Sequence, residues 1–199
     1  MTSYFARSPE DDPGQEDANE LTIEVIREVE GVRDVVGKYH RNFYRNFDSF
    51  CAFRRDGKDY ALYSPDYTTT RVMTLPDCHD IGGEEPHTHG FCPIDYLVPD
   101  EAAVGPLAGR FGLVFGCVWA WPCQIQFLDL RDVQHGVVRR SDLLVPSITV
   151  QQLSDFKDMR LRDCLECDLA NDGSVAFSLK CALEFRVKPD GSGLRPEPF

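Results

Sequence analysis

The feature that most constrains the fold of this chain is a period of two in its apolar residues. After Asn46, β-branched and aromatic residues alternate with polar ones in short runs that are bounded by turn-forming residues. The runs Ser49–Arg54 and Asp59–Tyr63 flank an Asp56-Gly57 pair, which is the strongest short-range signal for a hairpin. Because successive side chains of a strand point to opposite faces, this pattern predicts antiparallel β-structure.

The same pattern continues through the rest of the chain. Phe111–Trp119 is almost entirely apolar and predicts a central strand, with Gln124–Leu130 as its partner. Further strands are expected at Thr68–Leu75, Gly136–Arg139, Leu143–Val150, Met159–Leu169 and Val175–Val187, the last two closed on an Asn171-Asp172-Gly173 turn.

The segment from Asn19 to Phe47 has a different period. Apolar residues recur here largely at steps of three and four, which is the spacing of an amphipathic helix; they include Leu21, Ile23, Val25, Ile26, Val29, Val32, Val35, Val36, Tyr39, Phe43 and Phe47. The predicted fold class is therefore α+β, mainly β, with an N-terminal helical segment packed on an antiparallel sheet, sandwich or open barrel. The absence of alternating strands and helices argues against a Rossmann-like sheet.

Length and composition favour one domain. A chain of 199 residues lies within the usual single-domain range. We expect residues 1–18 to form a disordered acidic tail, residues 19–190 a single globular β-rich domain, and residues 191–199 a flexible tail rich in Pro and Gly.

The charge excludes several classes of partner. A formal net charge of −12 repels nucleic-acid backbones and anionic membranes, and it favours a basic protein partner. The short basic runs Arg54-Arg55 and Arg139-Arg140 are expected to be solvated turns. With no apolar run long enough for a signal peptide or for the ~18 residues of a membrane span, the chain is expected to be soluble and cytoplasmic. Its cysteines are then expected to be free or metal-bound.

Residues 78–92 concentrate the side chains that bind transition metals. This stretch holds Cys78, Glu84, His87, His89 and Cys92, with Asp95 shortly after it. In a strand, the two histidines of a His-x-His pair point to the same side and can reach one ion. The sequence therefore predicts that these six residues supply the ligands of a site for Zn or another divalent transition metal.

The His87-x-His89 pair followed by Asp95 is similar, over a short stretch, to the first motif of the cupins, which are metal-binding β-sandwiches. In that motif a glycine, two histidines and a glutamate stand at fixed intervals. Here Gly82 fills the glycine position one residue too close to His87, and Asp95 stands in place of the glutamate one residue late. The resemblance implies a metal-dependent enzyme in which His135 is a remote fourth ligand.

The sequence contains candidate residues for two other kinds of site, a redox dithiol and a cysteine nucleophile. Cys164 and Cys167 form a Cys-x-x-Cys, but within a strand their side chains would point to opposite faces, so a redox dithiol is not expected there. Cys92 beside His87 or His89 is the only local pair of nucleophile and base. No Gly-x-Ser-x-Gly elbow is present.

Three functions stay open on the sequence alone. The first is an acidic β-rich binding protein that engages a basic protein partner through a long loop at residues 75–109, with or without a bound Zn. The second is the cupin-like enzyme on His87 and His89. The third is a structural zinc module made of Cys78, His87, His89 and Cys92. The sequence does not decide whether the protein is an enzyme, and no catalytic residue is assigned.

Overall fold

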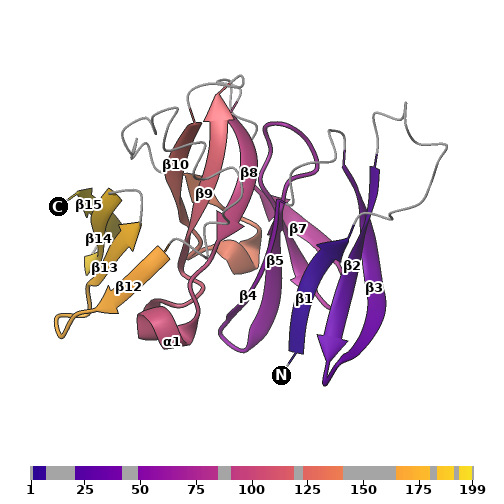
Figure 1. Cartoon of the computed structure of the whole chain (residues 1–199), viewed down its shortest axis with the longest axis horizontal. Coiled ribbons are helices and arrows are strands. Elements are labelled where there is room, and N and C mark those ends of the chain that lie inside the picture. Colours follow the sequence, from indigo (N-terminus) through magenta and orange to yellow (C-terminus); the bar gives the residue numbers. More distant parts are fainter. Residues whose placement is uncertain are drawn as a thin grey trace.

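The protein is mainly β-structure in a computed structural model that describes most of the chain (Figure 1). The described residues are 2–7, 21–41, 49–84, 91–118, 123–140, 165–179, 183–190 and 193–198. Within them the strands form four antiparallel sheets, and the one α-helix is a single turn.

The first two sheets come from the N-terminal half. The first sheet has the order β1-β2-β3, with β1 at Thr2–Arg7, β2 at Leu21–Val29 and β3 at Val32–Arg41. The second is a meander of order β4-β5-β6-β7, with β4 at Phe50–Arg55, β5 at Lys58–Tyr63, β6 at Arg71–Leu75 and β7 at His79–Gly83. The hairpin predicted around Asp56-Gly57 is confirmed as β4 and β5.

The third sheet contains the apolar strand expected at its centre. Its order is β11-β10-β9-β8, with β8 at Phe91–Leu97, β9 at Phe111–Val118, β10 at Cys123–Asp129 and β11 at Arg139–Arg140. Between these strands lie helix α1 at Glu101–Val104 and the 3₁₀ helices η1 at Gly105–Leu107 and η2 at Val133–His135.

The fourth sheet is formed by the C-terminal strands. Its order is β12-β13-β14-β15, with β12 at Leu165–Leu169, β13 at Val175–Leu179, β14 at Leu183–Asp190 and β15 at Gly193–Pro198. The predicted hairpin around Asn171-Asp172-Gly173 is confirmed as β12 and β13. The strands β1 and β15 fall within the two segments expected to be tails. The strand expected at Leu143–Val150 lies outside the described residues.

The expected N-terminal helical segment is wrong. Residues 21–41 form the hairpin β2–β3, which turns at Glu30 and Gly31, two residues with positive φ angles of 52° and 82°. A two-residue turn of this kind needs φ above zero at both positions, which glycine adopts without strain. The rest of the expected helix, residues 42–48, lies outside the described residues.

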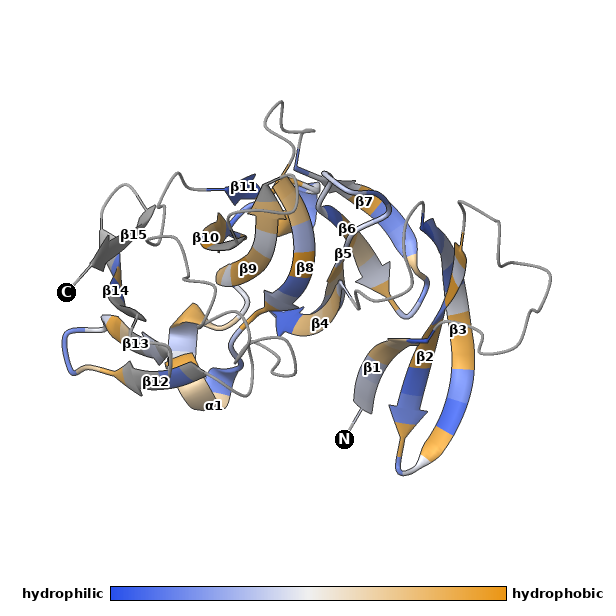
Figure 2. Cartoon of the chain, turned by 45° about the horizontal axis from the view of Figure 1, so that its top comes forward, coloured by the Kyte–Doolittle hydropathy of each residue, from blue (hydrophilic) through white to orange (hydrophobic). Residues whose placement is uncertain are grey.

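A β-bulge explains why this hairpin looked helical. Leu21, Ile23 and Val25 alternate as in a strand, but the pairing with β3 shifts between Val25 and Ile26. Val25 pairs with Gly37 and Ile26 with Val35, which leaves Val36 of β3 as an extra residue. The alternation of β3 therefore slips by one, and Val32, Val35, Val36 and Tyr39 stand at steps of three and four that imitate a helix. Hydrophobic and hydrophilic bands alternate along β2 and β3 in Figure 2.

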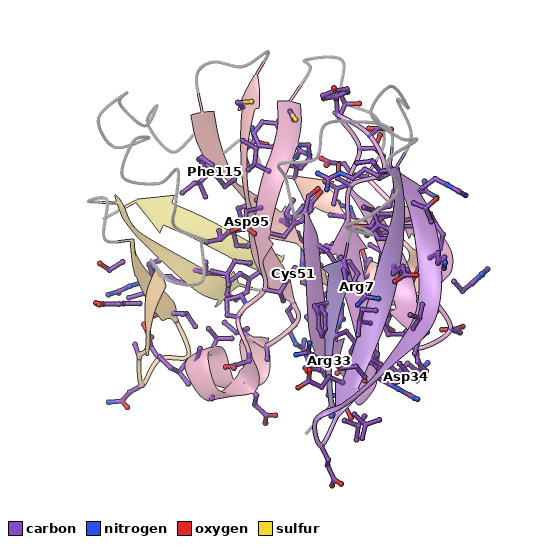
Figure 3. All side chains as sticks on the ribbon, turned by 45° about the vertical axis from the view of Figure 1, so that its right-hand side comes forward. Arg7, Arg33, Asp34, Cys51, Asp95 and Phe115 are labelled. Carbon is purple, nitrogen blue, oxygen red and sulfur yellow. The ribbon has the colours of Figure 1, made fainter. Side chains whose placement is uncertain are left out.

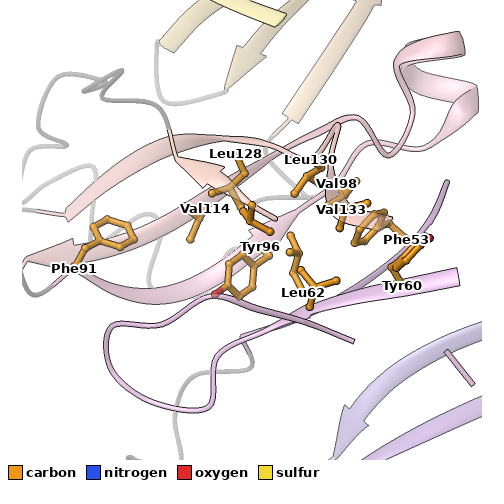
Figure 4. Packing of buried hydrophobic residues seen from close by; sticks show 12 residues of the cluster. Phe53, Tyr60, Leu62, Phe91, Tyr96, Val98, Val114, Leu128, Leu130 and Val133 are labelled. Carbon is orange, nitrogen blue, oxygen red and sulfur yellow. The ribbon is translucent and has the colours of Figure 1, made fainter. Parts of the chain in front are cut away.

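The second sheet lies between two cores. One face carries Leu62 and Val72, which pack against Tyr96, Val114 and other residues of the third sheet (Figure 4). The opposite face carries Ala61 and Met73, which pack against the first sheet. Because Leu62 and Met73 are both almost completely buried, the three sheets form layers with the second sheet in the middle.

The second and third sheets also meet edge to edge. Gly83, at the end of β7, forms a parallel bridge with Val137, and Gly82 lies directly against Gly136. A Cβ atom on Gly136 would lie on the carbonyl of Ile81, and its φ of 71° is also in the left-handed region. Only glycine therefore allows this backbone approach, which positions the candidate site described below.

The segment expected as one long loop at residues 75–109 is instead largely regular in its described part. It contains β7, β8, α1 and η1. None of the helices in the described residues has the length and apolar character needed to cross a bilayer.

Candidate functional site

The structure describes four of the six predicted metal ligands: Cys78, Glu84, Cys92 and Asp95. His87 and His89 lie in residues 85–90, outside the described residues, so their hypothesis stays a prediction. Cys78 lies in the turn before β7, whereas Glu84 follows the other end of that strand. At about 3.3 Å per residue, the backbone between them spans roughly 15–20 Å.

Cys78 belongs to a core and not to a cluster of ligands. It is half-buried, packs against the core between the first and second sheets, and lies against Gly37 of β3. Burial raises the pKa of its thiol. The described contacts of Cys78 are therefore packing contacts.

Glu84, one of the predicted ligands that the structure describes, makes both an ion pair and a backbone hydrogen bond. Its carboxylate accepts a hydrogen bond of 2.5 Å from Nη2 of Arg140, and both side chains are only 5% exposed. The Glu84 backbone N–H donates to the carbonyl of Thr70 at 2.8 Å. The Arg140 guanidinium neutralises the Glu84 carboxylate, so this carboxylate is committed to an ion pair between the second and third sheets.

The surroundings of Arg140 extend this buried polar group. Its guanidinium lies over the ring of Phe91, 4.4 Å from the ring centroid, and its Nη2 is 3.4 Å from Oγ1 of Thr70. The hydroxyl of Tyr96 donates to the same Oγ1 at 3.0 Å. Burial raises the pKa of Tyr96. Four elements therefore meet at one arginine, and the group fixes the start of β8 against the end of β7.

Cys92 and Asp95 occupy the strand after the undescribed histidines. Cys92 pairs across the ladder with Cys117 of β9, and Asp95 pairs with Phe115 after a bulge at Pro93. Asp95 and Phe115 are labelled in Figure 3, along the length of the third sheet. The Cys92 thiol hydrogen-bonds to Cys117, and this bond and burial raise the pKa of Cys92.

Sequence reasoning missed Arg140, Thr70 and Cys117. Arg139-Arg140 was expected to be a solvated turn; Arg139 is exposed, but Arg140 is buried. Similarly, Arg54 is exposed, whereas Arg55 is buried and donates to the carbonyl of Leu130. The usable signal for Arg140 was its position two residues after Val138, because residues two apart in a strand face the same side.

The described residues contain no group of three or more His, Cys, Asp or Glu side chains arranged to hold a metal ion. His87 and His89 lie outside these ranges, so this finding does not test a zinc site on them. The prediction for Zn therefore stands on the sequence alone.

Asp80 of β7 is a second centre of polar contacts in this segment. It accepts two hydrogen bonds from Arg71, at 2.6 and 3.1 Å, one from the Tyr63 hydroxyl at 2.5 Å, and one from the Gly82 N–H at 2.9 Å. Burial alone would raise the pKa of Asp80, but the bonds from Arg71, Tyr63 and Gly82 outweigh burial and lower it below 3.8.

We expect Asp80→Asn to remove part of the acid sensitivity of this fold. A carboxylate with a lowered pKa stabilises the folded state above its ordinary value of 3.8, and this contribution is lost as the pH falls through the folded-state pKa. The wild type should thus be more stable than the variant at neutral pH, and the difference should shrink below pH 3.8. Urea unfolding across this range measures it. Tyr63→Phe, which retains the Arg71 pair, should keep a weaker form of the dependence; a pH-independent difference for Asp80→Asn would contradict the assignment.

Residues 75–109 contain acidic side chains but no lysine or arginine. The carboxylates of this segment are Asp77, Asp80, Glu84, Glu85, Asp95, Asp100 and Glu101. Among the described ones, Asp77, Asp80, Asp100 and Glu101 are exposed. The Asp100 side chain also accepts from the N–H of Ala103 and caps α1.

Many arginines elsewhere in the described chain form ion pairs with carboxylates. On the first sheet Arg7 pairs with Glu24, Arg27 with Asp34 and Arg33 with Glu28 (Figure 3). The second and third sheets show the same pattern, in the pairs Arg54–Asp59, Arg71–Asp80, Arg131–Asp129, Arg139–Asp132 and Arg140–Glu84. Internal pairing of this kind leaves the excess of negative charge to dominate the outward field.

No model of a known protein family matches the chain, and no curated protein matches its sequence. The site has to be interpreted from its own geometry.

Proposed function

We propose that this protein binds a basic protein partner through the exposed carboxylates of residues 75–109. The observation that carries the proposal is the absence of any lysine or arginine from that segment, combined with the internal pairing of described arginines elsewhere. An excess of one charge speeds the encounter with a partner of the opposite charge.

The rigidity of the segment supports the same proposal. The Glu84–Arg140 pair and the Tyr96–Thr70 hydrogen bond connect the second sheet, which contains β7, to the third sheet, which contains β8. Asp77 and Glu101 therefore project from fixed elements, the β6–β7 turn and the first turn of α1. A preorganised surface loses less conformational entropy on binding than a flexible loop does.

The test compares two variants with the same change in net charge. Asp77→Asn/Glu101→Gln removes two exposed carboxylates inside the segment, and Glu30→Gln/Glu166→Gln removes two exposed carboxylates outside it. Basic proteins captured from the source cells on immobilised wild type are identified and purified, and their binding is measured by surface plasmon resonance.

We expect the first variant to lower the association rate constant several-fold and to weaken its salt dependence, because charges at an interface mainly steer the encounter. The second variant should bind like the wild type. Equal losses for both variants would show non-specific attraction, and the lack of any saturable basic partner would refute the proposal.

The two zinc hypotheses depend on residues that the structure does not describe. His87 and His89 are required by both the cupin-like enzyme and the structural zinc module. Elemental analysis of the purified protein, followed by His87→Ala/His89→Ala, tests them separately from partner binding.

A further inference from the structure

Cys92 and Cys117 face each other across two neighbouring strands. They are direct partners in the antiparallel ladder of β8 and β9, and both are half-buried thiols that form no disulfide in this structure. Opposed residues in such ladders have Cα atoms about 4.5 or 5.5 Å apart. Both distances lie within the range of about 4.4–6.8 Å that a disulfide requires. The hydrogen bond between the two thiols shows that their side chains meet.

We propose that Cys92 and Cys117 form an oxidisable dithiol that closes to a cross-strand disulfide by exchange with a low-molecular-weight disulfide such as oxidised glutathione. The modification site is independent of the partner-binding proposal. Because β8 is the outer strand of the third sheet, the new bond would tie it covalently to β9.

The exchange proceeds in two balanced steps. The Cys117 thiolate attacks a sulfur of oxidised glutathione, a mixed disulfide forms, and one glutathione thiolate leaves. The Cys92 thiolate then attacks the Cys117 sulfur, the protein disulfide forms, and the second glutathione leaves. Two protein thiols are oxidised, one glutathione disulfide is reduced, and the two protons end on the departing glutathione thiols.

Cys51 and Cys78 lack this geometry. Cys51 of β4 faces Leu62 across the ladder, and Cys78 lies in a turn against Gly37. The competing pairing is with Cys123 of β10, which is the ladder partner of Cys117 on its other side. The test must therefore distinguish a Cys92–Cys117 bond from a Cys117–Cys123 bond.

Peptide mapping of the folded protein makes this distinction. The protein is equilibrated with excess oxidised glutathione, the remaining thiols are alkylated, and the chain is cleaved with chymotrypsin, which cuts after aromatic residues. The sequence has such residues between Cys78 and Cys92 and between Cys117 and Cys123. We expect most of the peptide 92–96 to be recovered in a disulfide with 116–119, and the linked form to disappear on reduction.

Two comparisons make the result decisive. Cys92→Ser and Cys117→Ser should each abolish the linked pair, whereas Cys51→Ser should leave its yield unchanged; far-ultraviolet circular dichroism verifies that each variant is folded. The oxidised wild type should also melt at a higher temperature than the reduced protein. The proposal is overturned if 92–96 is recovered alkylated or glutathionylated instead of linked, if 116–119 is linked to the Cys123 peptide, or if folded and unfolded protein give the same mixture.

Discussion

Replacing Arg140 by methionine should lower the free energy of unfolding by about 3–5 kcal/mol, the usual cost of leaving one partner of a buried ion pair without the other. The Glu84 carboxylate would then remain in a site where it is only 5% exposed. The substitution also removes the contact of the guanidinium with the Phe91 ring. Urea unfolding of the wild type and of Arg140→Met, followed by circular dichroism, measures the loss.

A double-mutant cycle separates the ion pair from the packing around it. Glu84→Leu alone should destabilise the protein to a similar extent, because Arg140 is then the unpaired buried charge. The double variant Glu84→Leu/Arg140→Met should be clearly more stable than the sum of the two losses predicts, because apolar side chains can replace a buried ion pair at little net cost. Strict additivity of the two losses would mean that the two charges do not interact in the folded protein.

Local turn chemistry made two hairpins predictable. Asp56-Gly57 and Asn171-Asp172-Gly173 carry their signal within a few residues, so both hairpins were predicted. The single strand expected at Val175–Val187 is wrong, because that stretch contains parts of two antiparallel strands, β13 and β14. The N-terminal hairpin carried the same kind of signal in Glu30-Gly31. The β-bulge at Val36 of β3 hid it, because one extra residue changes a period of two into one that resembles a helix. A bulge depends on the partner strand, which the sequence of one strand does not show.

The candidate site was predictable only in its position along the chain. Residues 75–109 were correctly singled out as chemically rich, but Glu84 finds its partner 56 residues away in Arg140. Cys92 likewise meets Cys117 only through the register of β8 and β9. Contacts between distant segments depend on how sheets stack, and no local pattern encodes this stacking. The assignment of His87 and His89 as ligands stays a prediction from the sequence.

The arrangement of the second sheet between two others predicts large losses from truncation on either of its faces. Leu62→Ala and Met73→Ala should each lower the free energy of unfolding by about 2–5 kcal/mol, which is the range for removing a large apolar side chain from a packed core. Leu62 is 0% exposed in the core shared with the third sheet, and Met73 is 1% exposed in the core shared with the first.

An exposed valine provides the matched control for these two variants. Val32→Ala, at the tip of the β2–β3 hairpin where the side chain is 70% exposed, should change the free energy of unfolding by no more than about 0.5 kcal/mol. Guanidinium unfolding of all three variants compares the layers directly. A large loss for Leu62→Ala together with a loss for Met73→Ala no greater than that of Val32→Ala would mean that the first sheet does not cover the second. Large losses for both core variants require apolar cover on both faces, because a sheet with one face in solvent would leave one of these two side chains in water.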